Sequence, residues 1–454
     1  MTDYIIKVFT LSCAIIIFLS LSVASVISIF EKEKRAALKF FWLAIGLSLP
    51  FFIVGFAGYN VLGSVLSIFF TAIVLIFLFP YNRHSKFKNM TPTKQFDERD
   101  TMFARNELKP GTENFNYYYN RHPENKELDD HFRELPGLLD PKSHNYHPFG
   151  FASTDATFTT VASLKSLIKG RPVYQTQNIS AEDLAKYIKG WAKQLGADDC
   201  GITELKNYHL YSHKGRGDLY GKKIENEHNY AIAFTVEMDR DMISSAPGVS
   251  TVMESARQYF NAGAIAVQVA EFLRLIGYPA SAHIDGNYEV ICPLVARDAG
   301  LGEIGRMGLL MTPKLGPRVR ISVVTTDAPL STDKSKPDFT VIDFCLHCQK
   351  CASVCPAQAI QYNDMEEHDG VLRWQINSEA CYSFWCQAGT DCSRCMYVCP
   401  YSHPDLFMHN MVRQAVKRST LFRRLAVKLD DYIYGSRPAP KPLPNWMRIK
   451  NQSN

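Results

Sequence analysis

CLHCQKCASVCP, residues 345–356, places Cys345, Cys348, Cys351 and Cys355 at x2, x2 and x3 spacing and ends in Cys-Pro. That spacing is the ligand pattern of a 4Fe–4S cluster. A second run, DCSRCMYVCP at 391–400, repeats the x2 and x3 spacings and the Cys-Pro end. The doubled motif predicts a ferredoxin-like segment with two clusters, so the chain transfers electrons.

The Cys-Pro cysteine of each run serves the other cluster in two-cluster ferredoxins. We therefore assign one cluster to Cys345, Cys348, Cys351 and Cys399. The other cluster takes Cys355, Cys392, Cys395 and either Cys381 or Cys386, because the second run lacks a ligand at the first x2 position.

Alternative uses of these cysteines fit less well. A zinc site has two Cys pairs separated by a dozen or more residues, and c-type haem attachment needs C-x-x-C-H, which is absent. Clustered cysteines in a chain of 454 residues favour metal over a disulfide framework. The net charge of +5 is scattered, so we expect no nucleic-acid partner.

The amino-terminal region is strongly apolar. Residues 8–30 carry no charge and are long enough to span a bilayer, and residues 40–80 suggest a helical hairpin with a turn at Gly58-Tyr59-Asn60. This pattern predicts three transmembrane helices. A cleaved signal peptide is disfavoured, because its apolar part would be shorter and would follow a basic start.

Basic residues orient the three expected spans. The loop 31–39 carries Lys32, Lys34, Arg35 and Lys39, and Arg83, Lys86 and Lys88 follow the third span. Both segments belong on the cytoplasmic side by the positive-inside rule. We predict a multi-pass protein of the cell inner membrane, in contact with membrane lipid, with residues 81–454 in the cytoplasm.

The remaining sequence predicts a helix–strand domain. Residues 81–175 suggest a wrapping segment with few regular elements. Helices are expected at 180–195, capped by Ser180, and at 253–276, stopped by Gly277. Strands are expected at 230–236, 288–292 and 319–326. Alternating helices and strands indicate an α/β domain.

Gly300, Gly302 and Gly305 form a G-x-G-x-x-G turn. A dinucleotide site requires a strand before the motif and a helix starting within it, and neither is predicted here. A turn that admits a different bulky, phosphate-bearing cofactor remains open. Tyr259 and the pair Arg318 and Arg320 look unremarkable by themselves.

In combination, these residues resemble the reductive dehalogenases. The similar stretches run from about residue 95 to 410: DERDTMFAR (97–105), FLRLIGY (272–278), AGLGE (299–303), GPRVR (316–320) and the first cysteine run. The resemblance implies an α+β or α/β, nitroreductase-like corrinoid-binding domain with a bacterial-ferredoxin-like two-cluster insert.

The resemblance also implies a cofactor and site residues. The corrinoid, a cobalamin, would bind base-off without a protein ligand below cobalt, and the chain has no D-x-H-x-x-G ligand motif. Tyr259 matches the family's catalytic tyrosine, and Arg320, with Arg318 as the alternative, matches its cationic partner. Between these two residues the family has a polar residue, often Asn, which corresponds here to Asp285 or Asn287. The family's aromatic-rich stretch favours Cys381 over Cys386. The turn residues expected to contact the corrinoid are Gly300, Gly302, Glu303, Gly305, Arg306 and Met307.

The activity that the resemblance implies is removal of halide from an organohalide, expected to be an aromatic one, by cob(I)alamin reduced through the two clusters. A quinol, a ferredoxin or a flavodoxin would donate the electrons. The rival functions are an epoxyqueuosine reductase acting on transfer RNA and a non-catalytic, membrane-bound electron-transfer subunit. We expect five parts: a membrane anchor (1–80), a wrapping segment (81–175), a corrinoid-binding catalytic domain (176–335), a ferredoxin-like domain (336–410) and a C-terminal helix with a Pro-rich tail (411–454).

Overall fold

The computed structural model describes residues 2–78, 87–334 and 337–449. Its chain divides into two compact units. Unit 1 comprises Met1–His84 and Asp405–Pro438, and unit 2 comprises Ser85–Pro404 and Ala439–Asn454. Arg83 and Lys86, on which the orientation argument drew, lie outside the described residues. The five-part division stays a prediction.

Unit 1 is helical. Its helices are α1 (Thr2–Phe30), α2 (Lys34–Ala57), α3 (Asn60–Leu78), α16 (Phe407–Arg418) and α17 (Thr420–Tyr434). The α1–α2 hairpin packs through Cys13, Ala14, Ile17 and Phe51. Gly58 ends α2 with a φ of 76°, as the expected turn requires.

Two of these helices, not three, are long and apolar enough to cross a membrane by length and composition. They are α1 and α2. The apolar part of α3 with described side chains, Asn60–Leu75, is shorter than the roughly 20 residues that a span requires. The prediction of three spans is therefore corrected to two, and the orientation derived from three spans loses that support.

Unit 2 is built on an antiparallel sheet in the order β1-β2-β6-β3. Its strands are β1 (Asp199–Glu204), β2 (Tyr230–Glu237), β3 (Ala280–His283) and β6 (Val319–Thr326). β6 is central, with Val324 opposite both Ile232 and Ala282. The strands expected at 230–236 and 319–326 are confirmed.

The strand expected at 288–292 does not form. Val290 makes an isolated bridge with Leu210, and Cys292 already begins α11 (Cys292–Asp298), whose second residue is a proline. Proline at the start of a helix is favoured because its missing N–H needs no partner there.

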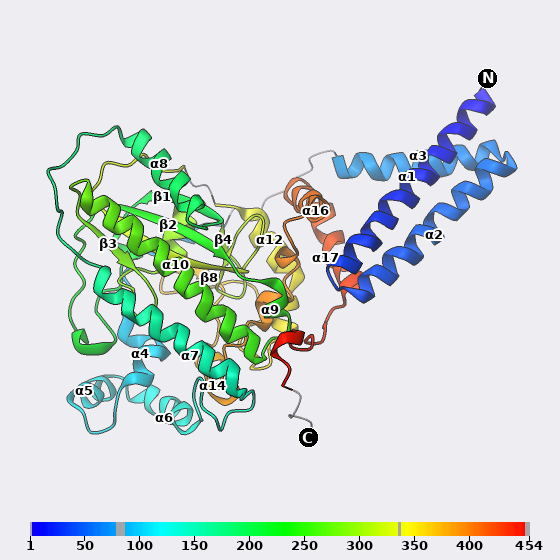
Figure 1. The fold of residues 1–454 in the computed structure, drawn as a ribbon. Coiled ribbons are helices and arrows are strands. Elements are labelled where there is room, and N and C mark those ends of the chain that lie inside the picture. The colour runs from blue at the N-terminus through cyan, green and yellow to red at the C-terminus, as the bar shows by residue number, and fades with distance from the viewer. Residues whose placement is uncertain (1, 79–86, 335–336, 450–454) are drawn as a thin grey trace. The chain divides into compact units, whose positions relative to one another are not determined.

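Helices cover both faces of the sheet (Figure 1). On one face, α8 (Ala181–Gln194) and α10 (Val249–Leu275) pack on the strands through Ile188 and Leu273. On the other, α11 packs through Val295. The two expected helices are confirmed, and Gly277 follows α10 with a φ of 94°. Because α10 is long, it contributes both core residues such as Leu273 and residues such as Tyr259 of the site described below.

The segment 81–175 is more regular than expected. It contains α4 (Met102–Glu107), α5 (Glu113–Arg121), α6 (Lys126–Glu134) and α7 (Pro148–Ser163). The hydroxyl oxygens of Thr101 and Thr112 accept backbone N–H bonds and cap α4 and α5. Three of these helices are too short to show a long apolar period, and α7 contacts α10 closely at Gly150.

The cysteine-rich segment consists of short elements joined by turns. They are α12 (Phe339–Cys348), α13 (Lys350–Val354), β7 (Glu366–His368), β8 (Val371–Arg373), α14 (Ser378–Ala388) and α15 (Arg394–Tyr397). The remaining α-helix and strands of unit 2 are α9 (Arg240–Ser244), β4 (Glu303–Ile304) and β5 (Leu310–Met311).

We predict that Arg274→Met on α10 destabilises the fold by about 3 kcal/mol, because Arg274 is 2% exposed and its donors serve three backbone carbonyls and a carboxylate. The acceptors are Leu167, Ile168, Ala280 and Glu271. Thermal unfolding followed by circular dichroism would measure the loss. Gln268→Ala, an exposed position on the same helix, should change stability by less than about 0.5 kcal/mol. Equal effects of both variants would contradict this assignment.

Candidate functional site

The first set of thiols gathers as expected. Burial raises the pKa of Cys399, and the thiols of Cys348, Cys345 and Cys351 raise it further. This mutual influence means that the four sulfur atoms are neighbours. In the first run, Gln349 lies directly after Cys348 with a φ of 51° and separates α12 from α13.

The second run repeats this turn. Ser393 follows Cys392 with a φ of 44° and precedes α15. A left-handed residue directly after a ligand cysteine therefore turns the chain in both motifs. A repeated backbone turn is consistent with two cluster sites of the same kind.

The second set of thiols includes Cys381 rather than Cys386. Burial raises the pKa of Cys395, and so do Cys392, Cys351, Cys381 and Cys355. Cys386 lies five positions after Cys381 in α14, so their side chains point about 140° apart around the helix. Cys386 instead packs with Phe132 and Tyr382.

The donor chemistry fits two 4Fe–4S clusters. The cysteines form no disulfides and gather four by four. Cys351 influences the pKa of both Cys395 and Cys399, so the two sets lie near each other. This proximity suits electron transfer from one cluster to the next.

Two buried arginines hold the cysteine-rich segment against the α/β domain. Arg306 donates to the carbonyls of Cys345 (3.1 Å), Gln361 (2.8 Å) and Asn363 (2.7 Å), and its guanidinium lies 4.8 Å from the ring centre of Trp374. These contacts give Arg306 a structural role besides its predicted place at the corrinoid.

Arg318 is the second of these arginines. It donates to the carbonyls of Ser402 (3.2 Å) and Met238 (2.5 Å) and to the carboxylate of Glu237 (2.6 Å). It precedes β6, and its donors are directed at these acceptors. Its place as an alternative to Arg320 beside Tyr259 finds no support in this geometry.

The glycine turn is held by close packing. A Cβ on Gly302 would lie 2.3 Å from the carbonyl oxygen of Met311, and one on Gly305 would lie 3.6 Å from the sulfur of Cys345. Gly300 has a φ of 81°. No helix starts within this motif, as all of it is described, so the dinucleotide context is missing.

The side chains of the turn are buried. Glu303 accepts N–H bonds from Ile304 (2.9 Å) and Asp338 (3.3 Å), and Met307 is buried. The turn therefore reaches the first cluster's cysteines. Contact of the turn with a corrinoid stays a prediction.

Tyr259 and Arg320 meet, as the resemblance implied. Tyr259 on α10 lies with its ring centre 4.6 Å from the guanidinium carbon of Arg320 on β6. Arg320 also donates to Ser255 (2.5 Å) and to Asp391 (3.1 Å), and Ser255 donates to the same Asp391 oxygen. Asp391 directly precedes Cys392, a predicted cluster ligand, so a hydrogen-bonded network links the tyrosine's partner to the second thiol set.

Opposing effects set the protonation of Tyr259. Arg320 lowers its pKa, but burial and the carboxylates of Asp285 and Asp391 raise it, and the net result lies above the ordinary value. Tyr259 therefore keeps its proton at neutral pH, and the guanidinium of Arg320 is close enough to stabilise the phenolate.

Asp285, rather than Asn287, is coupled to this pair. Burial raises the pKa of Asp285, while Arg216, Arg320 and Lys165 oppose that rise. The backbone N–H of Asn287 closes a turn by donating to the carbonyl of Ile284 at 3.0 Å.

Four further residues surround the pair and were missed from the sequence: Arg216, Ser255, Asp391 and Tyr288, with Tyr259 raising the pKa of Tyr288. Of these four, only Asp391 had a signal in the sequence that could have identified it, because it directly precedes Cys392, a predicted cluster ligand. The ring of Phe158 also lies 6.2 Å from that of Tyr259.

The site fits a further bound group. Tyr259 stays partly exposed although it lies on a core helix. Among the described residues, Arg320 Nε and Asp391 Oδ1 are buried without a hydrogen-bond partner. Such atoms usually have a partner in a complete site. The unsatisfied donor and acceptor beside an accessible phenol are consistent with a cofactor and substrate here.

Comparisons with known proteins agree with this picture. The family "4Fe-4S dicluster domain" matches residues 344–403. A tetrachloroethene reductive dehalogenase of Desulfitobacterium hafniense is 37% identical over 307 residues, which cover 57% of this chain and 55% of the relative. The chain thus spans about half the length of the curated relatives that it matches.

A solved reductive dehalogenase structure, for which B12-dependent dehalogenation is described, matches with a TM-score of 0.63 at 25% identity over 79% of this chain and 50% of that one. An epoxyqueuosine reductase of Staphylococcus aureus is 30% identical over 121 residues, covering 23% of this chain and 28% of the relative.

We predict that Cys381→Ser removes about half of the protein-bound iron, because it deletes one of the four thiolates of a cluster. Cys386→Ser should leave the iron content unchanged. Iron analysis and electron paramagnetic resonance of anaerobically purified protein would measure both variants. Loss of iron from the Cys386 variant with retention in the Cys381 variant would reverse the assignment.

Proposed function

Because this chain is related to the reductive dehalogenase family over more than half its length, we propose that it removes halide from an organohalide with electrons delivered through two 4Fe–4S clusters. The observation that carries the proposal is the contact of Tyr259 with Arg320, which a hydrogen bond joins to Asp391 beside Cys392. A non-catalytic electron carrier has no need of a phenol and guanidinium pair at this position.

Replacing a carbon–halogen bond with a carbon–hydrogen bond consumes two electrons and one proton and releases halide. A bound corrinoid would supply the low-potential chemistry that breaks the carbon–halogen bond. Tyr259 is the proposed proton donor, because its raised pKa keeps the phenol protonated at neutral pH. Arg320 then stabilises the phenolate until the proton is replaced.

Ser255 and Asp391 position Arg320 in this proposal. Both accept from the same guanidinium nitrogen, and Arg320 is mostly buried, so the guanidinium has little freedom to turn away from the tyrosine. A corrinoid would be held against this pair by residues of the turn Gly300–Met307.

The substrate is proposed only as a class. Analogy with the family favours a halogenated aromatic compound, while the D. hafniense relative is a tetrachloroethene reductive dehalogenase. A substrate panel therefore includes halogenated phenols and chlorinated ethenes. A quinol, a ferredoxin or a flavodoxin is the proposed electron donor.

We propose that α1 and α2 anchor the protein in the cell membrane. Lys32, Lys34, Arg35 and Lys39 at their connection favour a cytoplasmic loop. α16 begins three residues after Pro404 along the chain and belongs to the same compact unit as this loop. The catalytic part is therefore proposed to work in the cytoplasm.

The rival function, reduction of epoxyqueuosine in transfer RNA, would use Asp285 as the acid. The raised pKa of Asp285 gives that role some chemical support. The shorter match to epoxyqueuosine reductase, at 23% of this chain, favours dehalogenation. Cobalt analysis separates both enzymes from an electron carrier, and halide release separates the two enzymes.

We predict that Tyr259→Phe lowers the rate of halide release at least about 100-fold, the usual contribution of a positioned proton donor. Iron and cobalt contents should stay at wild-type levels. Tyr187→Phe, on the exposed surface of α8, is the matched control and should retain full activity. Normal turnover by Tyr259→Phe, or loss of turnover only in Asp285→Asn, would refute the role of Tyr259.

We predict that Asp391→Asn moves the alkaline limb of the pH–rate profile to lower pH by up to about one unit. Asp391 raises the pKa of Tyr259, so removing its charge makes the phenol lose its proton at lower pH. The pH dependence of halide release measures the shift, with iron content confirming that Cys392 still binds its cluster. An unchanged profile would contradict the coupling.

A further inference from the structure

Helix α17 exposes a regular stripe of leucines. Leu421, Leu425 and Leu429 recur every four residues and are 56%, 40% and 39% exposed. Residues four apart lie on one face of a helix, so these side chains form a continuous stripe. The next position in this series, Ile433, is buried together with Phe422, Ala426 and Val427, so the exposed stripe ends at Leu429.

Helix α16 has the same character. Phe407 and Met411, again four residues apart, are 78% and 53% exposed. Exposed basic side chains accompany the apolar positions of both helices. They are Arg418 on α16 and Arg424 and Lys428 on α17. Residues 407–434 contain six lysines and arginines against two aspartates. The helix pair thus combines an exposed apolar face with a positive charge.

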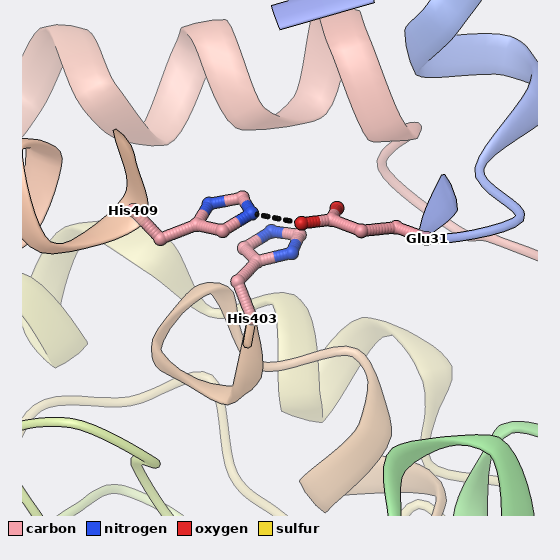
Figure 2. Close-up of side chains that lie close together, drawn as sticks. All are labelled: Glu31, His403 and His409. Atoms are coloured by element: carbon pink, nitrogen blue, oxygen red, sulfur yellow. Dashed lines mark hydrogen bonds and ion pairs between the residues drawn. The ribbon is translucent and has the colours of Figure 1, made fainter. Parts of the chain in front are cut away.

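Contacts within unit 1 attach this pair to the apolar hairpin at its connecting loop. His409 on α16 hydrogen-bonds the carboxylate of Glu31 at 2.7 Å, as Figure 2 shows. On α17, the Tyr432 carbonyl accepts from Arg35 at 3.4 Å, and the Tyr432 ring lies 4.2 Å from the Lys39 ammonium.

These contacts fix the level of the helix pair. Glu31 lies directly after α1, and Arg35 and Lys39 lie in the first turns of α2. A hairpin that crosses a bilayer has its connecting loop at the headgroup level. The helix pair is therefore held where the hydrocarbon layer meets the headgroups.

We propose that α16 and α17 lie in the bilayer surface, with the Leu421–Leu425–Leu429 stripe among the acyl chains and the basic residues at anionic headgroups. An apolar face bordered by Lys and Arg is the pattern of interfacial helices, and long basic side chains reach the headgroups from such a position. Soluble surfaces rarely keep a continuous apolar stripe exposed. The inference rests on the proposed membrane anchoring of α1 and α2.

The test places a photoreactive benzoylphenylalanine at single positions of the full-length protein in vesicles containing phosphatidylglycerol. Leu421 is the test position. Leu219 in unit 2, at 50% exposure, is the matched control, and Ile16 on α1, at 56%, reports on the anchor itself. Mass spectrometry counts the lipid adducts formed on illumination.

We expect adduct yields at Leu421 comparable with those at Ile16 and at least several-fold above those at Leu219. Arg424→Glu combined with Lys428→Glu should lower the yield at Leu421 several-fold and leave that at Ile16 unchanged. Adducts at Ile16 without adducts at Leu421 would overturn the surface assignment and leave the anchor intact. Absence of adducts at Ile16 would overturn the anchor and the inference together.

Discussion

The structure depends on three arginines between residues 306 and 320 that join the cysteine-rich segment to the sheet domain. Arg306 serves the carbonyls of Cys345, Gln361 and Asn363, Arg318 serves Ser402, and Arg320 meets Asp391. Burying a guanidinium costs several kcal/mol unless its donors are satisfied. Each arginine therefore fixes the position of the backbone or carboxylate that it contacts, and short helices with little core of their own stay in place.

One consequence is that Ser255, Asp391 and Arg320 form a hydrogen-bonded network between the second thiol set and Tyr259, the proposed proton donor. Asp391 precedes the ligand Cys392 and accepts from Arg320, whose guanidinium lies over Tyr259. β6 sets the register of this network, because it pairs with β2 and β3 and so stands at the centre of the sheet. A shift in the docking of the cluster segment would move the partner of the catalytic phenol.

Residue spacing predicted the cysteine motifs and several helices and strands of the fold. The predictions that were wrong or left open have physical causes. The cysteines were found because cluster geometry constrains sequence separation, and α8 was found because Ser180 and its apolar face agree. The strand expected near Val290 failed because Pro293 favours a helix start. The resemblance favoured Arg320 over Arg318, but strand alternation kept Arg318 as an alternative, because it does not reveal that Arg318 lies before the strand and is held by carbonyls. The choice between Cys381 and Cys386, which the resemblance had settled in favour of Cys381, also depends on the orientation of α14, which spacing does not give.

The protonation of Tyr259 shows why its surroundings cannot be reduced to one partner. Arg320 alone would lower the pKa of the phenol and favour loss of the proton before a substrate is bound. Burial and the carboxylates of Asp285 and Asp391 oppose this effect and keep the phenol protonated. In the proposed mechanism, the same guanidinium stabilises the phenolate that remains after proton transfer. A tyrosine influenced by two carboxylates and by a cation beside its ring thus meets both requirements of this mechanism. An isolated tyrosine with a pKa near 10 would keep its proton but would lack the cation that stabilises the phenolate.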